Sequence, residues 1–142
     1  MQNTDIYLIF NGDCEAAFKF YKTVFGGEFI ATQRYGEMPG SDKMKPEDYS
    51  KIMHMSLKLT PATTLMGSDI IAKDHMVFVQ GNNYHICLNA DSEKEADRLF
   101  DALSADGKIE MPMNKTFWGA YFGMCCDSFG TQWMISFSQP QP

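Results

Sequence analysis

Two histidines in strand-like segments are the side chains in this chain best suited to acid–base or ligand-binding chemistry. The first to consider is His85, which alternates with Cys87 and Asn89, whereas Ile86 and Leu88 point the other way. This pattern fits a general base or a hydrogen-bonding side chain in a cavity. The alternative interpretation is a partly buried histidine paired with a neighbouring carbonyl, because buried polar groups are normally hydrogen-bonded.

The second histidine, His54, lies in residues 51–59, where apolar and polar side chains alternate cleanly. It shares one strand face with Ser56 and Lys58. If that face lines a cleft, the three side chains could orient an anionic or carbonyl-bearing ligand. If it faces solvent, the three form an ordinary wet strand face.

Three further groups could contribute to a site. Phe117, Trp118 and a following glycine offer a flat aromatic wall that fits a cavity end, a subunit interface or a core. Asp69 ends a strand, where carboxylates often cap turns. The adjacent pair Cys125 and Cys126 has no helix N-terminus or basic cluster nearby to activate a thiol, so we expect no nucleophile there.

The elements that must position these residues occur twice. A shift of 79 positions brings Ile6 onto His85, and it also superposes the apolar positions of two helices. Each copy begins with a strand and continues into a helix that has Asp13 or the Ser92–Glu95 capping box at its start. Two copies of one unit predict a pseudo-symmetric domain with a small-molecule cleft between its halves.

The coarse order of elements is βαβββ, then βαβββ. This predicts an α+β fold with two modules in pseudo-two-fold arrangement, curved mixed sheets around a cleft, and helices outside. Residues 36–50 lack periodicity and read as a long loop. The strands after the first helix are expected at 28–35, 51–59 and 63–69, and those after the second helix near 108–113, 120–126 and 132–138. We expect a single domain, 1–142, with a first module at about 5–70 and a second at about 83–139.

Composition narrows the classes of function. The net charge of −6, with scattered lysines and two arginines, argues against nucleic acid as a partner. No apolar run approaches a membrane span, and the first residues do not resemble a signal peptide. Four cysteines without metal-ligand spacing fit free thiols, so we expect a cytoplasmic protein.

Several segments together resemble the glyoxalase / bleomycin-resistance / dioxygenase superfamily, also called vicinal oxygen chelate proteins, and most closely its PhnB-like branch. The resemblance covers essentially the whole chain. Its segments are YLIFNGDCEAAFKFYKTVFGGE, MHMSLKL, LMGSD, EADRLFDAL, GKIEMP, TFWGAYFG and DSFGTQWMIS. Members of this branch are often labelled demethylubiquinone methyltransferase-like, but the chain has no glycine-rich nucleotide loop for a methyl donor.

The resemblance also implies where a catalytic metal would bind in metal-dependent members. Position by position, the ligand sites fall on Ile6, Met66, His85 and Met134. Only the histidine is a good donor for a hard divalent cation, because isoleucine has no donor atom and methionine sulfur is soft. We therefore expect no metal and no other cofactor.

These observations favour a small-molecule-binding protein that forms a homodimer and has a metal-free cleft. The acidic charge and aromatic content suit a cationic or planar ligand. Two alternatives stay open: a lyase, isomerase or dioxygenase with a remodelled site around the catalytic candidates His85 and His54, and a dimeric interaction module. The expected ligand-binding residues are Ile6, His54, Met66, His85, Cys87, Phe117, Trp118, Gln132 and Met134.

Overall fold

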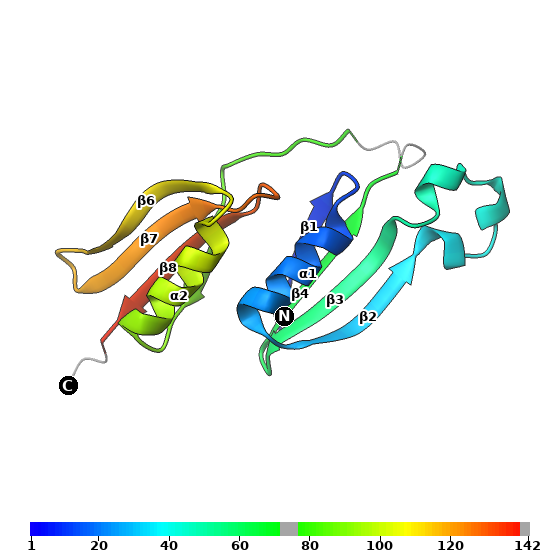
Figure 1. Ribbon diagram of the computed structural model, residues 1–142. Helices are drawn as coiled ribbons and strands as arrows, with labels where there is room; N and C mark the ends of the chain where they lie inside the picture. The colour runs from blue at the N-terminus through cyan, green and yellow to red at the C-terminus, as the bar shows by residue number, and fades with distance from the viewer. Residues whose placement is uncertain (72–76, 140–142) are drawn as a thin grey trace. The chain divides into compact units, whose positions relative to one another are not determined.

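Each half of the chain builds one four-stranded sheet with one long helix against it (Figure 1). The computed structural model describes residues 1–71 and 77–139, and the chain divides into two units, Met1–Val79 and Gln80–Pro142. The first unit holds β1 (Ile6–Phe10), α1 (Cys14–Phe25), β2 (Glu28–Arg34), β3 (Ile52–Thr60) and β4 (Thr63–Asp69). The second holds β5 (Ile86–Asn89), α2 (Glu93–Ser104), β6 (Lys108–Lys115), β7 (Ala120–Cys126) and β8 (Gln132–Ser138).

The two sheets have the same topology. Their strand orders are β1-β4-β3-β2 and β5-β8-β7-β6. In each sheet the first strand of the unit runs parallel to its last strand, and the remaining neighbours are antiparallel. The predicted α+β fold with two βαβββ modules and mixed sheets is confirmed.

The repeat of 79 positions is accurate for the two helices. Ala17, Tyr21 and Val24 of α1 are buried, and so are their counterparts in α2. One apolar face of each helix therefore packs on its own sheet, as the period of 3.6 residues requires. The helix-facing side of each sheet is marked by a glycine that leaves room for an aromatic ring. A Cβ on Gly67 would meet Phe18, and one on Gly123 would meet Phe100. We call the opposite side of each sheet its open face.

Asp69 ties the start of α1 to the sheet. Its Oδ1 accepts hydrogen bonds from the backbone N–H groups of Gly12 and Cys14, both at 3.0 Å, and its Oδ2 accepts one from Ile52 at 2.9 Å. Asp13 stands at the helix start but makes no side-chain capping bond. The expected cap at Asp13 was therefore wrong, because the buried carboxylate of Asp69 takes that role from a distant strand. In α2, by contrast, the Oγ of Ser92 accepts from the Glu95 N–H, as predicted.

The segment expected to be one long loop at 36–50 carries short 3₁₀ turns. They are η1 (Tyr35–Glu37), η2 (Ser41–Lys43) and η3 (Pro46–Asp48). Each turn closes with the next backbone N–H donating to its first carbonyl. Glycine, proline and charged residues thus favour single tight turns here, without a longer helix.

Candidate functional site

A polar group occupies the open face of the first sheet. The Tyr7 hydroxyl lies 3.2 Å from Nδ1 of His54, and the Ser56 hydroxyl lies 3.3 Å from Nε2 of the same ring. The Tyr7 and His54 rings stack, with centroids 5.7 Å apart and planes inclined by 29°. Both imidazole nitrogens therefore have a hydroxyl partner, and a neutral ring donates one of these hydrogen bonds and accepts the other.

Of the two residues expected on this side of β1 and β4, only one lies there. Met66 pairs with Tyr7 across the parallel strands, so the two share the open face. Ile6 pairs with Leu65, and Leu65 alternates with Met66 onto the helix-facing side. Ile6 therefore faces helix α1. Tyr7 occupies the open-face position that the 79-residue shift had assigned to Ile6.

In the second unit, His85 contacts a carboxylate from the far edge of its sheet. Its Nε2 lies 3.4 Å from Oε1 of Glu110; the His85 side chain is 14% exposed and that of Glu110 28% exposed. His85 directly precedes β5 and Glu110 lies in β6, so two strands separate them in the sheet order. The contact requires the sheet to curve so that its edges approach each other over the open face. Such a pair could position the imidazole as a base.

Cys87 and Met134 lie together on the same open face. They are direct partners across β5 and β8. Cys87 is exposed and Met134 is half-buried, whereas their strand neighbours Trp133 and Ile135 are fully buried on the helix-facing side. The predicted alternation of β8 is thus confirmed, with Trp133 and Ile135 toward the helix.

Gln132 combines deep burial with an incomplete set of hydrogen bonds. Its residue is 6% exposed, and within residues 1–71 and 77–139 its Oε1 has no hydrogen-bond partner. It borders a pocket of about 400 Å³ with Gln80, Gly81, Asn82, Cys126 and Gly130. A buried acceptor left unpaired costs free energy, so this oxygen gains from any N–H or O–H donor that reaches it. The atom exposes less than 1 Å² to solvent, so the amide must turn toward the pocket before it can accept from an outside group.

Gln80 holds one wall of this pocket in place. Its Nε2 donates to the Phe129 carbonyl at 2.8 Å, and its amide covers Gly130, where any Cβ would collide with it. Gly130 also has a φ of +90°, a conformation that side chains rarely adopt. The tight turn before β8 therefore depends on glycine for two reasons, and it keeps the segment around Gln80 close to Gln132.

The cysteines near this pocket are protonated thiols. Burial, with a contribution from Asp127, raises the pKa of Cys125 to about 12. The same causes raise the pKa of Cys126, whose Sγ lies 3.6 Å from the Asp127 carbonyl as a donor. A thiolate nucleophile is disfavoured at both positions, in agreement with the sequence interpretation.

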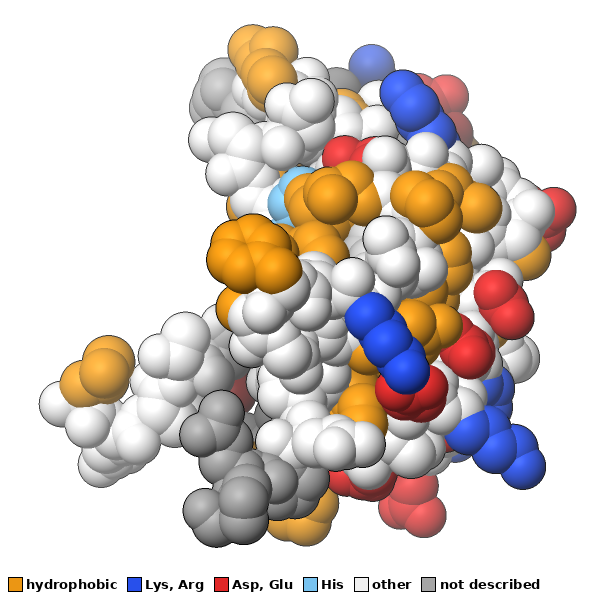
Figure 2. Space-filling view, turned by 90° about the vertical axis from the view of Figure 1, so that its left-hand side faces the viewer, with side chains coloured by type: hydrophobic (Ala, Val, Ile, Leu, Met, Phe, Trp, Pro, Cys, Tyr) orange, Lys and Arg blue, Asp and Glu red, His pale blue; other side chains and the backbone are white. Residues whose placement is uncertain are grey.

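Phe117 and Trp118 lie at the tip of the hairpin between β6 and β7. They are 98% and 61% exposed, and their rings meet edge to face at 4.9 Å. Figure 2 shows hydrophobic side chains exposed among charged ones on the side of the molecule that it draws. Because both are exposed to this extent, the rings of Phe117 and Trp118 form a surface feature of the second unit.

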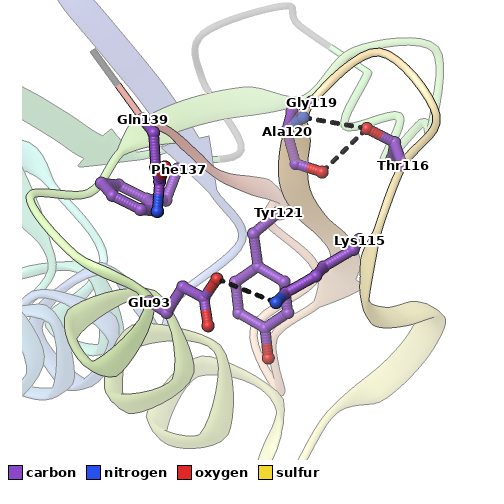
Figure 3. A pocket seen from close by; sticks show the side chains of 8 residues that line it. All are labelled: Glu93, Lys115, Thr116, Gly119, Ala120, Tyr121, Phe137 and Gln139. Carbon is purple, nitrogen blue, oxygen red and sulfur yellow. Dashed lines mark hydrogen bonds and ion pairs between the residues drawn. The ribbon is translucent and has the colours of Figure 1, made fainter. Parts of the chain in front are cut away.

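The base of this hairpin borders a second pocket, of about 250 Å³ (Figure 3). Its lining comprises Glu93, Lys115, Thr116, Gly119, Ala120, Tyr121, Phe137 and Gln139. Lys115 and Glu93 point toward one another across it, with Nζ and Oε1 3.7 Å apart. The Tyr121 hydroxyl donates to Asp97 at 2.6 Å, and this bond to a carboxylate raises the pKa of Tyr121 to about 12. The lining of this pocket contains neither Phe117 nor Trp118.

The donor set does not fit a hard divalent metal. Among the residues that the structure describes, no group of three or more His, Cys, Asp and Glu side chains could hold a metal ion. Met66 and Met134 bring thioethers to their open faces, Tyr7 brings a phenol, and His85 is engaged with Glu110. Magnesium, calcium and zinc bind poorly to thioethers, so these residues do not fit the ligand set of such a metal.

Sequence reasoning missed two members of these open faces, Tyr7 and Glu110. The sequence of β1, IYLIF, is apolar throughout, so it carries no alternation that could have shown on which face Tyr7 lies. Glu110 lies at a register shift between Ile109 and Met111, and such an irregularity carries no reliable signal in the sequence.

None of the helices in the described part of the chain is long and apolar enough to cross a membrane. A family model described as the Glyoxalase/Bleomycin resistance protein/Dioxygenase superfamily matches residues 4–135. Protein YjdN of Escherichia coli (strain K12) is 33% identical over 146 residues, which cover 96% of this chain and 95% of YjdN.

Two solved structures are similar over nearly their whole length. Protein PA1353 from Pseudomonas aeruginosa is 38% identical with a TM-score of 0.85, covering 99% of this chain and 100% of that chain. The PhnB protein from Bacillus cereus, described as a putative 3-demethylubiquinone-9 3-methyltransferase, is 25% identical with a TM-score of 0.77, covering 96% and 100%. The chain therefore belongs to the glyoxalase, bleomycin-resistance protein and dioxygenase superfamily, in its PhnB-like branch.

Proposed function

We propose that this protein binds a small organic molecule on the open face of its second sheet, and that Gln132 is the residue that selects it. The observation that carries the proposal is the buried Oε1 of Gln132, which has no partner in the described residues and borders a pocket of about 400 Å³. On the same open face we propose His85, Cys87 and Met134 as further ligand-binding residues. On the open face of the first sheet we propose, as a separate set, His54 and Met66, with Tyr7 in place of Ile6.

The chemistry of the pocket defines the class of ligand. Gln132 offers an acceptor, so the ligand must bring an N–H or O–H donor. Burial is the main cause that raises the pKa of Cys126; the nearby carboxylates of Asp127 and Glu110 raise it further, and Lys108 lowers it. Two of the three charges near this thiol are thus negative, which favours a cationic ligand. A planar or cationic molecule with N–H donors fits both conditions, and the methionines of the open face adapt to a flat apolar surface.

A thermal-shift and calorimetric screen tests this proposal. The probes are a set of planar cations, amidines, primary amides and small carboxylic acids. We expect the melting temperature to rise with a donor-bearing probe, because ligands that bind only the folded state stabilise it. The rise should vanish in Gln132→Met.

The matched control is Gln139→Met, which places the same substitution at the pocket of Figure 3. The response should be unchanged there. Equal responses of the wild type and Gln132→Met to every probe would refute the assignment of Gln132.

One observation favours a second function, that of a lyase, isomerase or dioxygenase with a remodelled site. The carboxylate of Glu110 lies 3.4 Å from the Nε2 of His85, and such pairs orient an imidazole for proton transfer. Exchange of a substrate proton with deuterated solvent, lost in both His85→Gln and Glu110→Gln, would support this candidate. Ligand binding without any exchange would leave the binding function alone.

We further propose a homodimer in the cytoplasm, since exposed aromatic rings such as Phe117 and Trp118 are common at subunit contacts. Light scattering should give twice the mass of 16.1 kDa, and a mass of one chain in Phe117→Ser/Trp118→Ser would make this hairpin the contact. A monomeric wild type would end the proposal of a dimer. We do not propose methyl transfer, because the residues that line these two pockets do not form a nucleotide-binding loop.

A further inference from the structure

Four sulfur-bearing side chains stand in one row across the open face of the second sheet. Met111 pairs with Met124, Met124 pairs with Met134, and Met134 pairs with Cys87. Each of the strands β6, β7, β8 and β5 contributes one of them, in the order in which the strands lie in the sheet.

All four side chains share the open face. Direct cross-strand partners point to the same side of a sheet, and the strand neighbour Gly123 faces helix α2. The register shift before Met111 allows Glu110 and Met111 both to face the open side. Met111 is half exposed and Cys87 is exposed, so both ends of the row are open to solvent, whereas Met124 and Met134 between them are half-buried.

We propose that this row is a binding site for a soft monovalent metal ion, Cu⁺ or Ag⁺. Thioethers and thiolates select such ions over hard cations. The Cβ atoms of facing residues in a sheet are about 4.5–5.5 Å apart. A zinc–thiolate bond measures about 2.3 Å, so two sulfurs on opposite sides of an ion with bonds of that order are separated by about 4.6 Å. Neighbouring members of the row can therefore hold one ion between them without a change of backbone.

The centre of the site is the pair Met124 and Met134. Each of these methionines has a further sulfur-bearing residue on the next strand, Met111 beside Met124 and Cys87 beside Met134. Cys87 supplies the one thiol of the row and releases its proton to solvent when it coordinates. No electron is transferred, so the ion keeps its charge. The carboxylate of Glu110 precedes Met111 and adds a negative field that favours a cation.

The test is a titration of the whole protein with silver nitrate in a chloride-free buffer, followed by NMR of labelled methionine methyl groups. Ag⁺ replaces Cu⁺ because it is redox-inert. We expect saturation near one ion per chain, with shifts of the methyl signals of Met111, Met124 and Met134. Met113 is the internal control: it lies on β6 with its Sδ against the helix-facing Gly123.

Two variants decide the outcome. In Met124→Leu/Met134→Leu, which keeps apolar volume and removes both thioethers, we expect Ag⁺ affinity to fall by at least about tenfold per thioether. Met113→Leu is the matched control and should bind like the wild type. Circular dichroism and melting temperature verify that each variant folds.

Three results would overturn the proposal: no binding by the wild type, unchanged binding by the double variant, or an equal loss in Met113→Leu. Unchanged binding by the double variant that disappears in Cys87→Ser would identify a thiolate alone as the ligand. Gln132 is not part of the proposed ion site. The response of Gln132→Met to organic probes therefore tests the proposed ligand site whether or not the protein binds Ag⁺.

Discussion

Replacing Gln132 by methionine should make the protein more stable. The Oε1 of Gln132 is buried without a partner in the described part of the chain, and the residue is only 6% exposed. An unpaired buried acceptor costs about 1–3 kcal/mol, whereas an apolar group of similar shape carries no such cost. Methionine matches glutamine in length and adapts to irregular space. We expect a gain of about 1–2 kcal/mol in the free energy of unfolding.

Urea denaturation followed by tryptophan fluorescence measures this gain. For a chain of this size, 1 kcal/mol corresponds to about 2–4 °C in melting temperature. Gln80→Met is the matched control, because the Gln80 Nε2 donates to the Phe129 carbonyl at 2.8 Å. Losing this partly exposed bond should destabilise by about 0.5–1 kcal/mol. A glutamine-to-methionine substitution is thus expected to raise the free energy of unfolding at one position of this pocket and to lower it at the other.

A loss of stability above about 1 kcal/mol in Gln132→Met would refute the reasoning, since it would mean that the amide oxygen is paired in the folded protein. A gain in stability with an intact response to the organic probes would separate the two claims. The oxygen would then be unpaired, but it would not be the group that recognises the ligand.

Three other predictions concern the framework around the site. Asp69→Asn should destabilise by about 2–4 kcal/mol in urea denaturation, because the new amide N–H₂ opposes backbone N–H donors; a loss below 1 kcal/mol would contradict this. Hydrogen bonds from Arg34 lower the pKa of Glu15 below its ordinary 4.5, so this pair stabilises the fold above that pH and its contribution is lost as the pH falls through the lowered value. Arg34→Met should flatten the pH dependence of stability below pH 4.5, and an unchanged profile would count against the pair. Exposed Cys87 should react with a thiol reagent in the native protein, whereas Cys125, whose pKa burial raises to about 12, should react only on unfolding; mass spectrometry of labelled peptides distinguishes them.

Much of the fold could be predicted because its signals are local. Strands β4, β7 and β8 have the bounds expected from alternation and turn residues, at 63–69, 120–126 and 132–138. The helical repeat of 79 positions also placed Tyr21 and Phe100 in equivalent core positions. Period and burial are properties of short segments, so the sequence carries them directly.

The faces of the first strands were harder to predict. The helices follow the shift of 79 positions, but the faces of the first strands do not. Ile6 faces helix α1, whereas its counterpart His85 lies on the open face, because the next residue, Ile86, faces helix α2. Strand faces alternate at every residue, so an offset wrong by one assigns the opposite side. This is why Tyr7, not Ile6, lies beside His54.

The rest of the candidate site depends on contacts between residues far apart in the chain. Glu110 meets His85 only because the sheet curves and its register shifts in β6. The missing partner of Gln132 Oε1 likewise depends on the whole surrounding structure. Gln132 could be predicted as an open-face residue from the alternation of β8, but the state of its amide could not.

The most direct test of ligand binding at Gln132 is a crystal structure of the protein with the donor-bearing probe that stabilises it most. We predict density for the probe in the pocket formed with Gln80, Asn82 and Cys126, with an N–H or O–H donor within hydrogen-bond distance of Gln132 Oε1. A probe found only in the pocket of Figure 3, or a Gln132 amide already bonded to another part of the same chain, would contradict the account.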